Sequence, residues 1–320
     1  MVRNQIIGLT SVLLLSTIMM ALSSCLKDDN NTDNASGRAR IEITDAPIDD
    51  PNIKSVFITV ADIKIDGKSW AGFTGKTSFD LLALQNGKTK LLGEGQLDDK
   101  TYTEIVLVLD TEVDSSGNNF GSYVEDISGV KRKLEGGTEF VVKAKGNFES
   151  KKDQTTDLVV DIDLRKAIMY KAGSTTEFQF VTNAELYESV RLLDKANTGK
   201  ISGNCSDGVS ASDKIVAYAY KVGDYNQNER FPQGTSQVQF KNAVSSSAVG
   251  TDGSFSFAFL ESGQYEVHFI SYEQDAQGIL QAKGELQLSV VGSVLNLLQL
   301  NVVAKGTINL DLLVTGILFF

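Results

Sequence analysis

Few side chains in this sequence could carry out acid–base or nucleophilic chemistry. His268 is the only histidine, so it is the single candidate imidazole base, and a metal site built from several histidines is excluded. Cys205 lies beside Ser206 and Asp207 without a nearby signature of a catalytic thiol. We therefore expect a buried or merely tolerated cysteine and a histidine at the surface or at the edge of a groove, rather than a Cys–His pair.

Carboxylates are the remaining candidates for catalysis or metal binding. Two of them facing each other across a cleft could hydrolyse a glycosidic bond. Oxygen ligands for Ca²⁺ could come from a pair on one strand face or from a cluster in one turn, namely Asp161 and Asp163, or Asp45, Asp49 and Asp50. No loop has the spacing of a known calcium motif, so we expect solvated acids and predict neither a metal site nor a cofactor.

The N-terminal segment carries the most specific motif. Residues 6–22 are apolar apart from small Gly, Ser and Thr, follow a positive charge at Arg3, and end in Leu22-Ser23-Ser24-Cys25. This pattern is typical of a secretory signal peptide. The box ending in cysteine resembles that of bacterial lipoproteins, which are cleaved before the cysteine and acylated on its thiol. The resemblance implies a signal peptide at 1–24 and membrane attachment through Cys25; an ordinary signal with an incidental cysteine is the alternative.

Residues 25–37 contain hardly any apolar side chain and predict a flexible acidic tether. Within it, Lys27-Asp28-Asp29 resembles the short export signal of Bacteroidota lipoproteins that reach the outer face of the outer membrane. The resemblance implies a lipid-anchored protein that faces the cell exterior. The alternatives are a merely solvated spacer and a periplasmic orientation.

The charge and cysteine content exclude several classes of partner. The sequence has 30 basic and 41 acidic residues, a net charge of −11, and its lysines and arginines are scattered. We therefore expect no nucleic-acid partner and no attraction to anionic membrane surfaces. With Cys25 acylated, only Cys205 would remain, so an intrachain disulfide is excluded. The length after the signal suits two domains better than one.

The pattern that must position any site is that of short strands. Ala39, Ile41 and Ile43 alternate with polar residues, and similar runs occur at 56–60, 102–109, 139–144 and 158–164. No apolar period of 3.6 residues persists long enough to indicate a major helix. The sequence predicts an all-β chain of two tandem antiparallel β-sandwiches, at 38–195 and 199–320.

The first of these segments resembles domain of unknown function family 4382. The resemblance rests on motifs that are specific as a set, which are Thr44-Asp45-Ala46-Pro47, 56–60 with 63–65, Trp70, Phe79-Asp80-Leu81-Leu82, 102–109 and 161–168. It implies a β-sandwich of secreted bacterial lipoproteins and carries no catalytic residues to transfer.

The second segment resembles the carboxypeptidase-regulatory or prealbumin-like sandwich in its turn at 251–255 and its corner at 260–267. It departs from that family by a polar insert at 222–234. Thr307–Phe320 is apolar enough to be a closing strand. Tyr102 and Tyr265 each open a strand five residues after a leucine, and we expect both to be structural corner tyrosines whose hydroxyls return to the backbone.

Aromatic side chains near loops are the candidate ligand contacts, because sugar-binding sandwiches stack pyranose rings on exposed aromatic faces. Trp70 follows a turn, and Tyr225 and Phe231 belong to the insert. In the competing interpretation Trp70 fills the first core and the neighbouring Tyr218 and Tyr220 are half-buried strand residues.

These patterns predict a non-catalytic lipoprotein of the cell envelope that binds an extracellular ligand such as a glycan. The alternative is a structural, adhesion or assembly component that binds a protein partner. The chain offers no convincing catalytic constellation, so we do not expect an enzyme. The sequence leaves the oligomeric state open.

Overall fold

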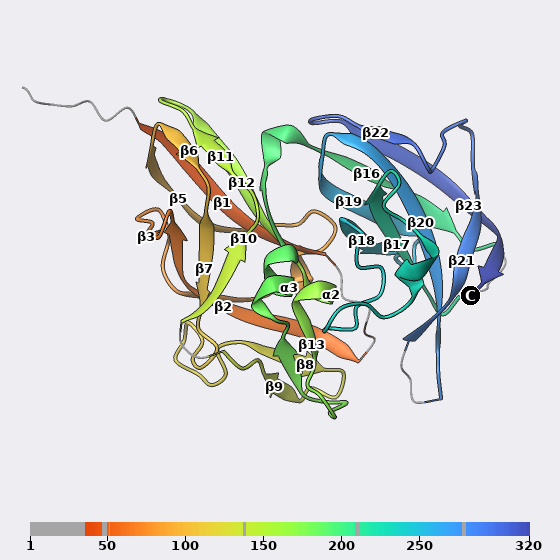
Figure 1. Cartoon of the computed structure of the whole chain (residues 1–320), viewed down its shortest axis with the longest axis horizontal. Helices are drawn as coiled ribbons and strands as arrows, with labels where there is room; N and C mark the ends of the chain where they lie inside the picture. Colours follow the sequence, from red (N-terminus) through yellow and green to blue (C-terminus); the bar gives the residue numbers. More distant parts are fainter. Residues whose placement is uncertain (1–35, 47–49, 51, 137–138, 209–211, 277–279) are drawn as a thin grey trace, which may run out of the picture. The chain divides into compact units, whose positions relative to one another are not determined.

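The computed structural model describes residues 36–320 except 47–49, 51, 137–138, 209–211 and 277–279 (Figure 1). The predicted signal peptide, Cys25, most of the tether and Asp49 lie outside the described residues. Residues 36–320 form one compact unit, and the division into two domains stays a prediction. Among the described helices, none has the length and apolar character needed to span a bilayer.

Residues 36–194 form two larger sheets and two small ones. The four-stranded sheet has the order β15-β12-β1-β5 and consists of β1 (Ser36–Ala46), β5 (Lys90–Asp98), β12 (Thr155–Asp163) and β15 (Val190–Asp194). The seven-stranded sheet consists of β2 (Ile53–Ile65), β3 (Lys68–Ser69), β4 (Thr77–Asp80), β7 (Ile105–Leu109), β8 (Tyr123–Asp126), β9 (Lys131–Lys133) and β10 (Phe140–Ala144). The two-stranded sheets pair β6 (Lys100–Tyr102) with β11 (Phe148–Ser150) and β13 (Ile168–Tyr170) with β14 (Phe178–Phe180).

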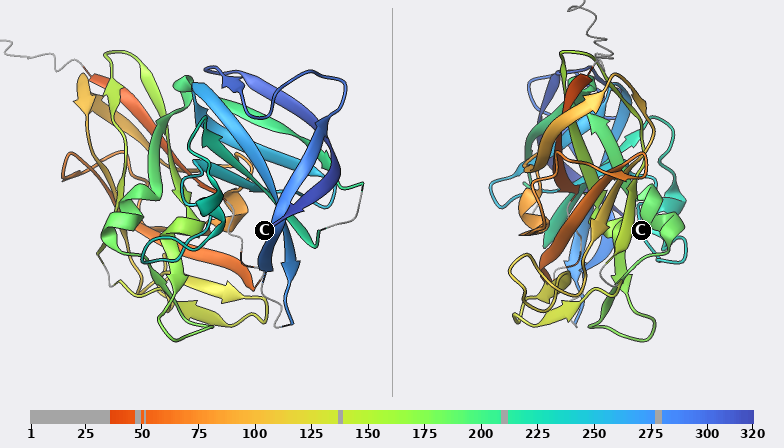
Figure 2. Two further views of the ribbon diagram at one scale, coloured as in Figure 1. Left: turned by 45° about the vertical axis from the view of Figure 1, so that its right-hand side comes forward. Right: turned by 90° about the vertical axis from the view of Figure 1, so that its left-hand side faces the viewer.

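Helices in this part are short, as the sequence predicts. They are the 3-10 turn η1 (Leu82–Leu84) and the α-helices α2 (Leu164–Ala167) and α3 (Asn183–Glu188). The two α-helices lie next to each other beside the strands (Figure 2). The side chain of Thr182 caps α3 by accepting a hydrogen bond from the Glu185 amide, which satisfies one of the free amides of the first turn.

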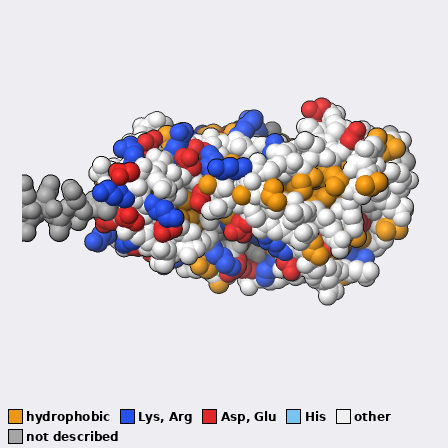
Figure 3. Space-filling model, turned by 90° about the horizontal axis from the view of Figure 1, so that it is seen from above, with side chains coloured by type: hydrophobic (Ala, Val, Ile, Leu, Met, Phe, Trp, Pro, Cys, Tyr) orange, Lys and Arg blue, Asp and Glu red, His pale blue; other side chains and the backbone are white. Residues whose placement is uncertain are grey.

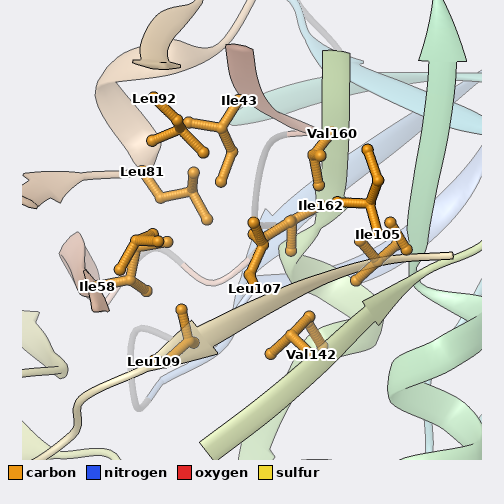
Figure 4. Packing of buried hydrophobic residues seen from close by; sticks show 14 of the residues in the cluster. Ile43, Ile58, Leu81, Leu92, Ile105, Leu107, Leu109, Val142, Val160 and Ile162 are labelled. Atoms are coloured by element: carbon orange, nitrogen blue, oxygen red, sulfur yellow. The ribbon is translucent and has the colours of Figure 1, made fainter. Parts of the chain in front are cut away.

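The core of this part follows from the alternation of apolar residues. Ile43 of β1 and Val160 of β12 meet Ile58 and Leu107 of the seven-stranded sheet, and all four are almost completely buried (Figure 4). Ile41 belongs to the same buried cluster. β-Branched side chains suit this pleated, two-layer environment. Burial of apolar surface between the two sheets is thus the main stabilising contribution here.

Residues 198–319 form one eight-stranded sheet. Its strands are β16 (Thr198–Ser206), β17 (Lys214–Lys221), β18 (Ser245–Ala248), β19 (Ser254–Glu261), β20 (Gly263–Gln274), β21 (Leu280–Val290), β22 (Leu300–Val302) and β23 (Thr307–Phe319). The order is β18-β17-β20-β21-β23-β16-β19, and β22 pairs with β20. The 3-10 turn η2 (Lys195–Asn197) precedes β16, and η3 (Gln227–Arg230) lies in the insert after β17. The predicted closing strand is confirmed as β23.

The two faces of this sheet pack against different partners. Tyr265, Val267 and Phe269 of β20 join the enclosed core, while Ile270 belongs to a second cluster with Tyr218, Tyr220 and Phe240 on the other face. The side chains of β20 therefore alternate between the two faces of the sheet. The second cluster is covered by the long connection between β17 and β18, which is longer than the insert predicted at 222–234 and is called the insert from here on (residues 222–244).

The all-β prediction is confirmed. Pairing is antiparallel between most strands, but β1 with β12 and β16 with β23 are parallel, which the sequence pattern did not indicate. Both corner tyrosines are also confirmed. The Tyr102 hydroxyl donates to the carbonyl oxygen of Asp98 at 3.2 Å, and the Tyr265 hydroxyl donates to that of Glu261 at 2.8 Å.

Candidate functional site

The three aromatic residues proposed as ligand contacts occupy different environments. Trp70 is 6 % exposed and lies in the first core, where its ring covers Gly72. This placement matches the interpretation in which Trp70 fills the core. Tyr225 is half-buried, and its hydroxyl donates to Glu285 at 3.0 Å. Phe231 is 53 % exposed, and the Arg230 guanidinium lies 4.9 Å from its ring centre.

His268 is buried, contrary to the surface position that we expected. Its ring stacks on Tyr225 with 3.7 Å between the centres, and its Nδ1 lies 2.6 Å from Oε1 of Glu285. Burial acts to raise the pKa of Glu285, but the hydrogen bonds and charge of His268, with the Tyr225 hydroxyl, lower it overall. The expectation of a surface histidine was wrong because Tyr225 of the insert covers the face of β20 that carries His268. The sequence pattern does not indicate that the insert folds over this face.

Cys205 is buried in the core of the second sheet, a placement that the sequence left open. Burial and, secondarily, the charge of Asp207 raise the pKa of its thiol to about 12. The thiol is therefore protonated and weakly nucleophilic at neutral pH.

The carboxylates expected to be solvated are mostly buried or paired. Asp161 forms an ion pair with Arg191, and Asp163 lies 2.8 Å from Arg165 and 3.3 Å from Lys166. The pKa of Asp45 lies well above its usual value, first because it is buried and then because Asp161 and Asp163 are negatively charged neighbours. The expectation of solvated acid was wrong for these residues, because β1 and β12 lie in the interior of the four-stranded sheet. Across the described part of the chain, no group of three or more His, Cys, Asp or Glu side chains is placed to hold a metal ion.

The insert is fastened to the two α-helices by charged side chains. Arg165 of α2 donates to the carbonyl oxygens of Gln239 and Phe240 at 3.3 and 3.4 Å, and Lys166 donates to that of Ala243 at 2.5 Å. The Arg165 guanidinium also lies 5.1 Å from the ring centre of Tyr218.

Glu185 of α3 makes a second attachment. Its Oε1 accepts hydrogen bonds from the amides of Thr235 and Ser236 at 2.9 and 3.1 Å. Burial acts to raise the pKa of Glu185, but these bonds and those from the hydroxyls of Thr182 and Ser236 lower it overall. These hydrogen bonds attach the insert to both α2 and α3.

A pocket of about 520 Å³ opens where the insert meets the β13–β14 hairpin. Its apolar lining comes from Ile168, Met169, Tyr170, Phe178, Pro232, Tyr272 and Leu280. Its polar lining includes Asp50, Gln237, Gln239 and Gln281. A volume within about 300–1,000 Å³, apolar walls and a few convergent polar groups are typical of a small-molecule site.

The aromatic pair in this pocket, Tyr170 and Phe178, is positioned by the hairpin and by Asp50. Tyr170 and Phe178 are cross-strand partners in the hairpin, with ring centres 4.5 Å apart. The Tyr170 hydroxyl donates to Asp50 Oδ2, and the amide of Asn52 donates to Asp50 Oδ1 at 2.8 Å. Burial and the Asp50 carboxylate raise the pKa of Tyr170, so its hydroxyl stays protonated and remains a donor.

A second, more highly charged cleft of about 770 Å³ lies on the other side of the same stretch of the insert. Ser236 and Val238 line both spaces. Charges of both signs face the cleft, among them Lys145, Arg191, Lys241, Glu188 and Asp224. This mixture favours no ligand of a single charge, so the aromatic pocket is the better candidate site.

Sequence reasoning missed the aromatic pocket. The apolar runs 168–170 and 178–180 around Gly173 do carry a hairpin signal. Asp50, Gln239 and Gln281 are all distant from this hairpin in the sequence. No local sequence pattern predicts that the hairpin lies close to them. Of the predicted contacts, only Phe231 lies near the pocket, next to the lining residue Pro232.

Comparison with known proteins identifies part of the chain. The family model for a domain of unknown function, DUF4382, matches residues 36–180. The match bears out the family resemblance for that segment, which is slightly less than half of the chain. It ends at the last residue of the β13–β14 hairpin, so the insert lies beyond it. No curated protein matches the chain.

Solved structures resemble the chain only weakly. A leucine-rich repeat protein from Bacteroides thetaiotaomicron has 10 % identity and a TM-score of 0.20, with 88 % of this chain and 26 % of that chain covered. The Bacillus anthracis TIE protein has 13 % identity, a TM-score of 0.18 and coverages of 86 % and 33 %. BcpA, the major pilin subunit of Bacillus cereus, has 8 % identity, a TM-score of 0.19 and coverages of 88 % and 71 %. Similarities at this level carry no argument about function.

Proposed function

We propose that this chain is a lipid-anchored, non-catalytic protein of the cell envelope that binds a glycan in the pocket between the insert and the β13–β14 hairpin. The observation that carries the proposal is the composition of that pocket. Tyr170 and Phe178 supply apolar ring surface, and Gln237, Gln239 and Gln281 supply amide groups. Sugars present the complementary surfaces, an apolar ring face and hydroxyl groups at its rim.

Support for a binding role rather than catalysis comes from the residues described above. Cys205 is buried with a raised pKa, and the Nδ1 atom of His268 contacts Glu285 beneath Tyr225. Neither side chain lines the aromatic pocket. Attachment through Cys25 and exposure to the cell exterior remain part of the proposal on the strength of the N-terminal motif.

The test is a screen of the full chain in detergent against plant, host and microbial polysaccharides, followed by titration calorimetry on any ligand found. Tyr170→Ala and Gln281→Ala should weaken binding about two- to twelvefold, the effect of losing about 0.5–1.5 kcal/mol. Gln287→Ala is the matched control, because Gln287 is also exposed on β21 but does not line the pocket.

Two outcomes would contradict the proposal. Binding that survives both pocket substitutions would place the glycan elsewhere on the chain. If no glycan binds in the screen, the alternative function is favoured, that of an assembly component that binds a protein partner. Cross-linking on intact cells would then identify that partner. Anchoring is tested separately, by the mass of the N-terminal peptide and by protease treatment of intact cells.

A further inference from the structure

The loop that joins β21 to β22 exposes an unusual amount of apolar surface. Residues 291–299 include Val291, Val294, Leu295 and Leu298, whose exposure ranges from 43 % for Leu295 to complete exposure for Val294. Val303, just after β22, is 53 % exposed. Seen from above, hydrophobic side chains form a band over the half of the structure that holds β22 (Figure 3). Contiguous patches of this kind mark sites of contact with proteins or membranes.

The backbone of this loop is well organised, so the exposure is built into the fold. The backbone amide of Val291 donates to the backbone carbonyl oxygen of Asp311 at 2.7 Å. The backbone carbonyl oxygen of Leu297 accepts from the amide of Val267 at 2.9 Å. Asn296 adds a local turn, since its Oδ1 accepts from the Leu298 amide at 3.0 Å. Leu297 itself packs partly against the core, which leaves its neighbours directed outward.

Charge is absent from the whole segment. From Leu286 to Ala304 the sequence contains no Asp, Glu, Lys or Arg, although the chain as a whole has a net charge of −11. A surface that contacts another folded protein usually carries a polar rim of hydrogen-bonding and charged groups. An uncharged stretch of Val and Leu side chains is better suited to the boundary between lipid headgroups and acyl chains.

Strand directions place this loop at the end of the fold where the described chain begins. β15 runs antiparallel to β12, which is parallel to β1, so η2 follows β15 at the end where β1 starts. After η2, the carbonyl oxygen of Thr198 accepts from the amide of Lys305, beside Val303. The start of β1 and the strand β22 both lie at the upper end in Figure 1.

We propose that the β21–β22 loop rests on the lipid bilayer to which the chain is anchored, with Val294 and Leu298 inserted among the acyl chains. This inference rests on the proposed anchoring through Cys25. Residues 25–35, fully extended, span at most about 40 Å. The anchor therefore keeps Ser36, and this end of the fold, within that distance of the membrane. A second, apolar contact would fix the orientation of the fold and the direction in which the glycan pocket faces.

The test places a fluorescent reporter at the loop in the full chain, reconstituted in phosphatidylcholine vesicles. Val294→Trp should show a blue-shifted emission, and lipids brominated on the acyl chains should about halve it, because insertion brings the indole to the acyl boundary. Trp70 is the only native tryptophan and is buried, so its emission is a constant background. Ile127→Trp is the matched control. Ile127 is 66 % exposed in the turn after β8. Its amide donates to the backbone carbonyl oxygen of Asn52, just before β2, so it lies away from the end of the fold that holds the β21–β22 loop.

A second variant tests whether the apolar side chains cause the contact. Adding Leu298→Asp to Val294→Trp should remove most of the quenching, because a carboxylate at this depth is costly. Vesicles containing anionic lipid should give weaker quenching than neutral ones at low salt, given the net charge of −11.

The outcomes separate this proposal from the one on which it rests. A chain that is acylated and associates with vesicles, yet shows equal quenching at positions 127 and 294, would overturn loop insertion and leave the anchor intact. A chain without acylation that still shows selective quenching at 294 would overturn the anchor alone. Cross-linking of the loop to a second protein without lipid quenching would show that a protein partner covers it.

Discussion

Tyr265 donates its hydroxyl hydrogen to the carbonyl oxygen of Glu261, four residues earlier, and Lys221 donates to the same hydroxyl oxygen at 2.7 Å. The ring is 1 % exposed. This corner joins the end of β19 to the start of β20 and is repeated by Tyr102 and Asp98 at the end of β5.

The corner bonds should contribute measurable stability. We expect Tyr265→Phe to lower the free energy of unfolding by about 1–2 kcal/mol, because the ring stays in the core while both hydrogen bonds of the hydroxyl are lost. Urea unfolding measures the change. Tyr187→Phe, at a tyrosine that is 41 % exposed, is the control and should change the free energy by less than about 0.5 kcal/mol.

Removal of the Arg165 charge should loosen the insert. Its side chain is 3 % exposed and contacts Asp163 and two insert carbonyl groups. We expect Arg165→Met to cost about 3–5 kcal/mol, because it leaves Asp163 and those carbonyl oxygens incompletely paired. Limited proteolysis should then cut within residues 222–244. Arg38→Met, which breaks the exposed pair with Glu94, should cost less than about 1 kcal/mol and leave the insert resistant.

The contact between His268 and Glu285 should make stability depend on acid pH. The pKa of Glu285 is lowered below 4.5 in the folded chain. Its contribution is therefore complete above pH 4.5 and is lost as the pH falls through the folded value. Glu285→Gln should cost about 1–2 kcal/mol at pH 7, and the difference from the wild type should shrink between about pH 5 and pH 3. A difference that stays constant over that range would contradict this assignment, and Glu139→Gln, at an exposed position, is the control.

Asp45 should have the opposite dependence. The pKa of Asp45 in the fold is raised well above its usual value of 3.8. The folded chain therefore retains a proton that the unfolded chain releases, and the free energy of unfolding falls as the pH rises above 3.8. We expect Asp45→Asn to stabilise the chain by about 1–3 kcal/mol at pH 8, the scale of a buried polar group without full compensation. The gain should be smaller at pH 5. Thermal unfolding at both pH values measures it, with Asp157→Asn, at an exposed position of β12, as the control. A gain that is equal at the two pH values would argue against a protonated Asp45.

Local pattern explains which features could be predicted from the sequence. The alternation around Ile41 and Ile43 and the corner tyrosines each depend on residues within one strand or one turn. The burial of His268 depends instead on the insert folding back over β20. The aromatic pocket depends on Asp50, Tyr170 and Gln281 meeting from three separate elements. The parallel pairs β1–β12 and β16–β23 join strands about a hundred residues apart, and no short-range pattern reports such pairings.

The placement of β23 has a consequence for how the chain is made. β23 is the last strand, and it lies between β21 and β16, the first strand of its sheet. Until residues 307–319 have left the ribosome, β16 lacks its parallel partner and β21 lacks one neighbour. The second sheet therefore cannot close before β23 has been synthesised. A chain truncated before Thr307 would lack β23, leaving two open strand edges and a core exposed to aggregation.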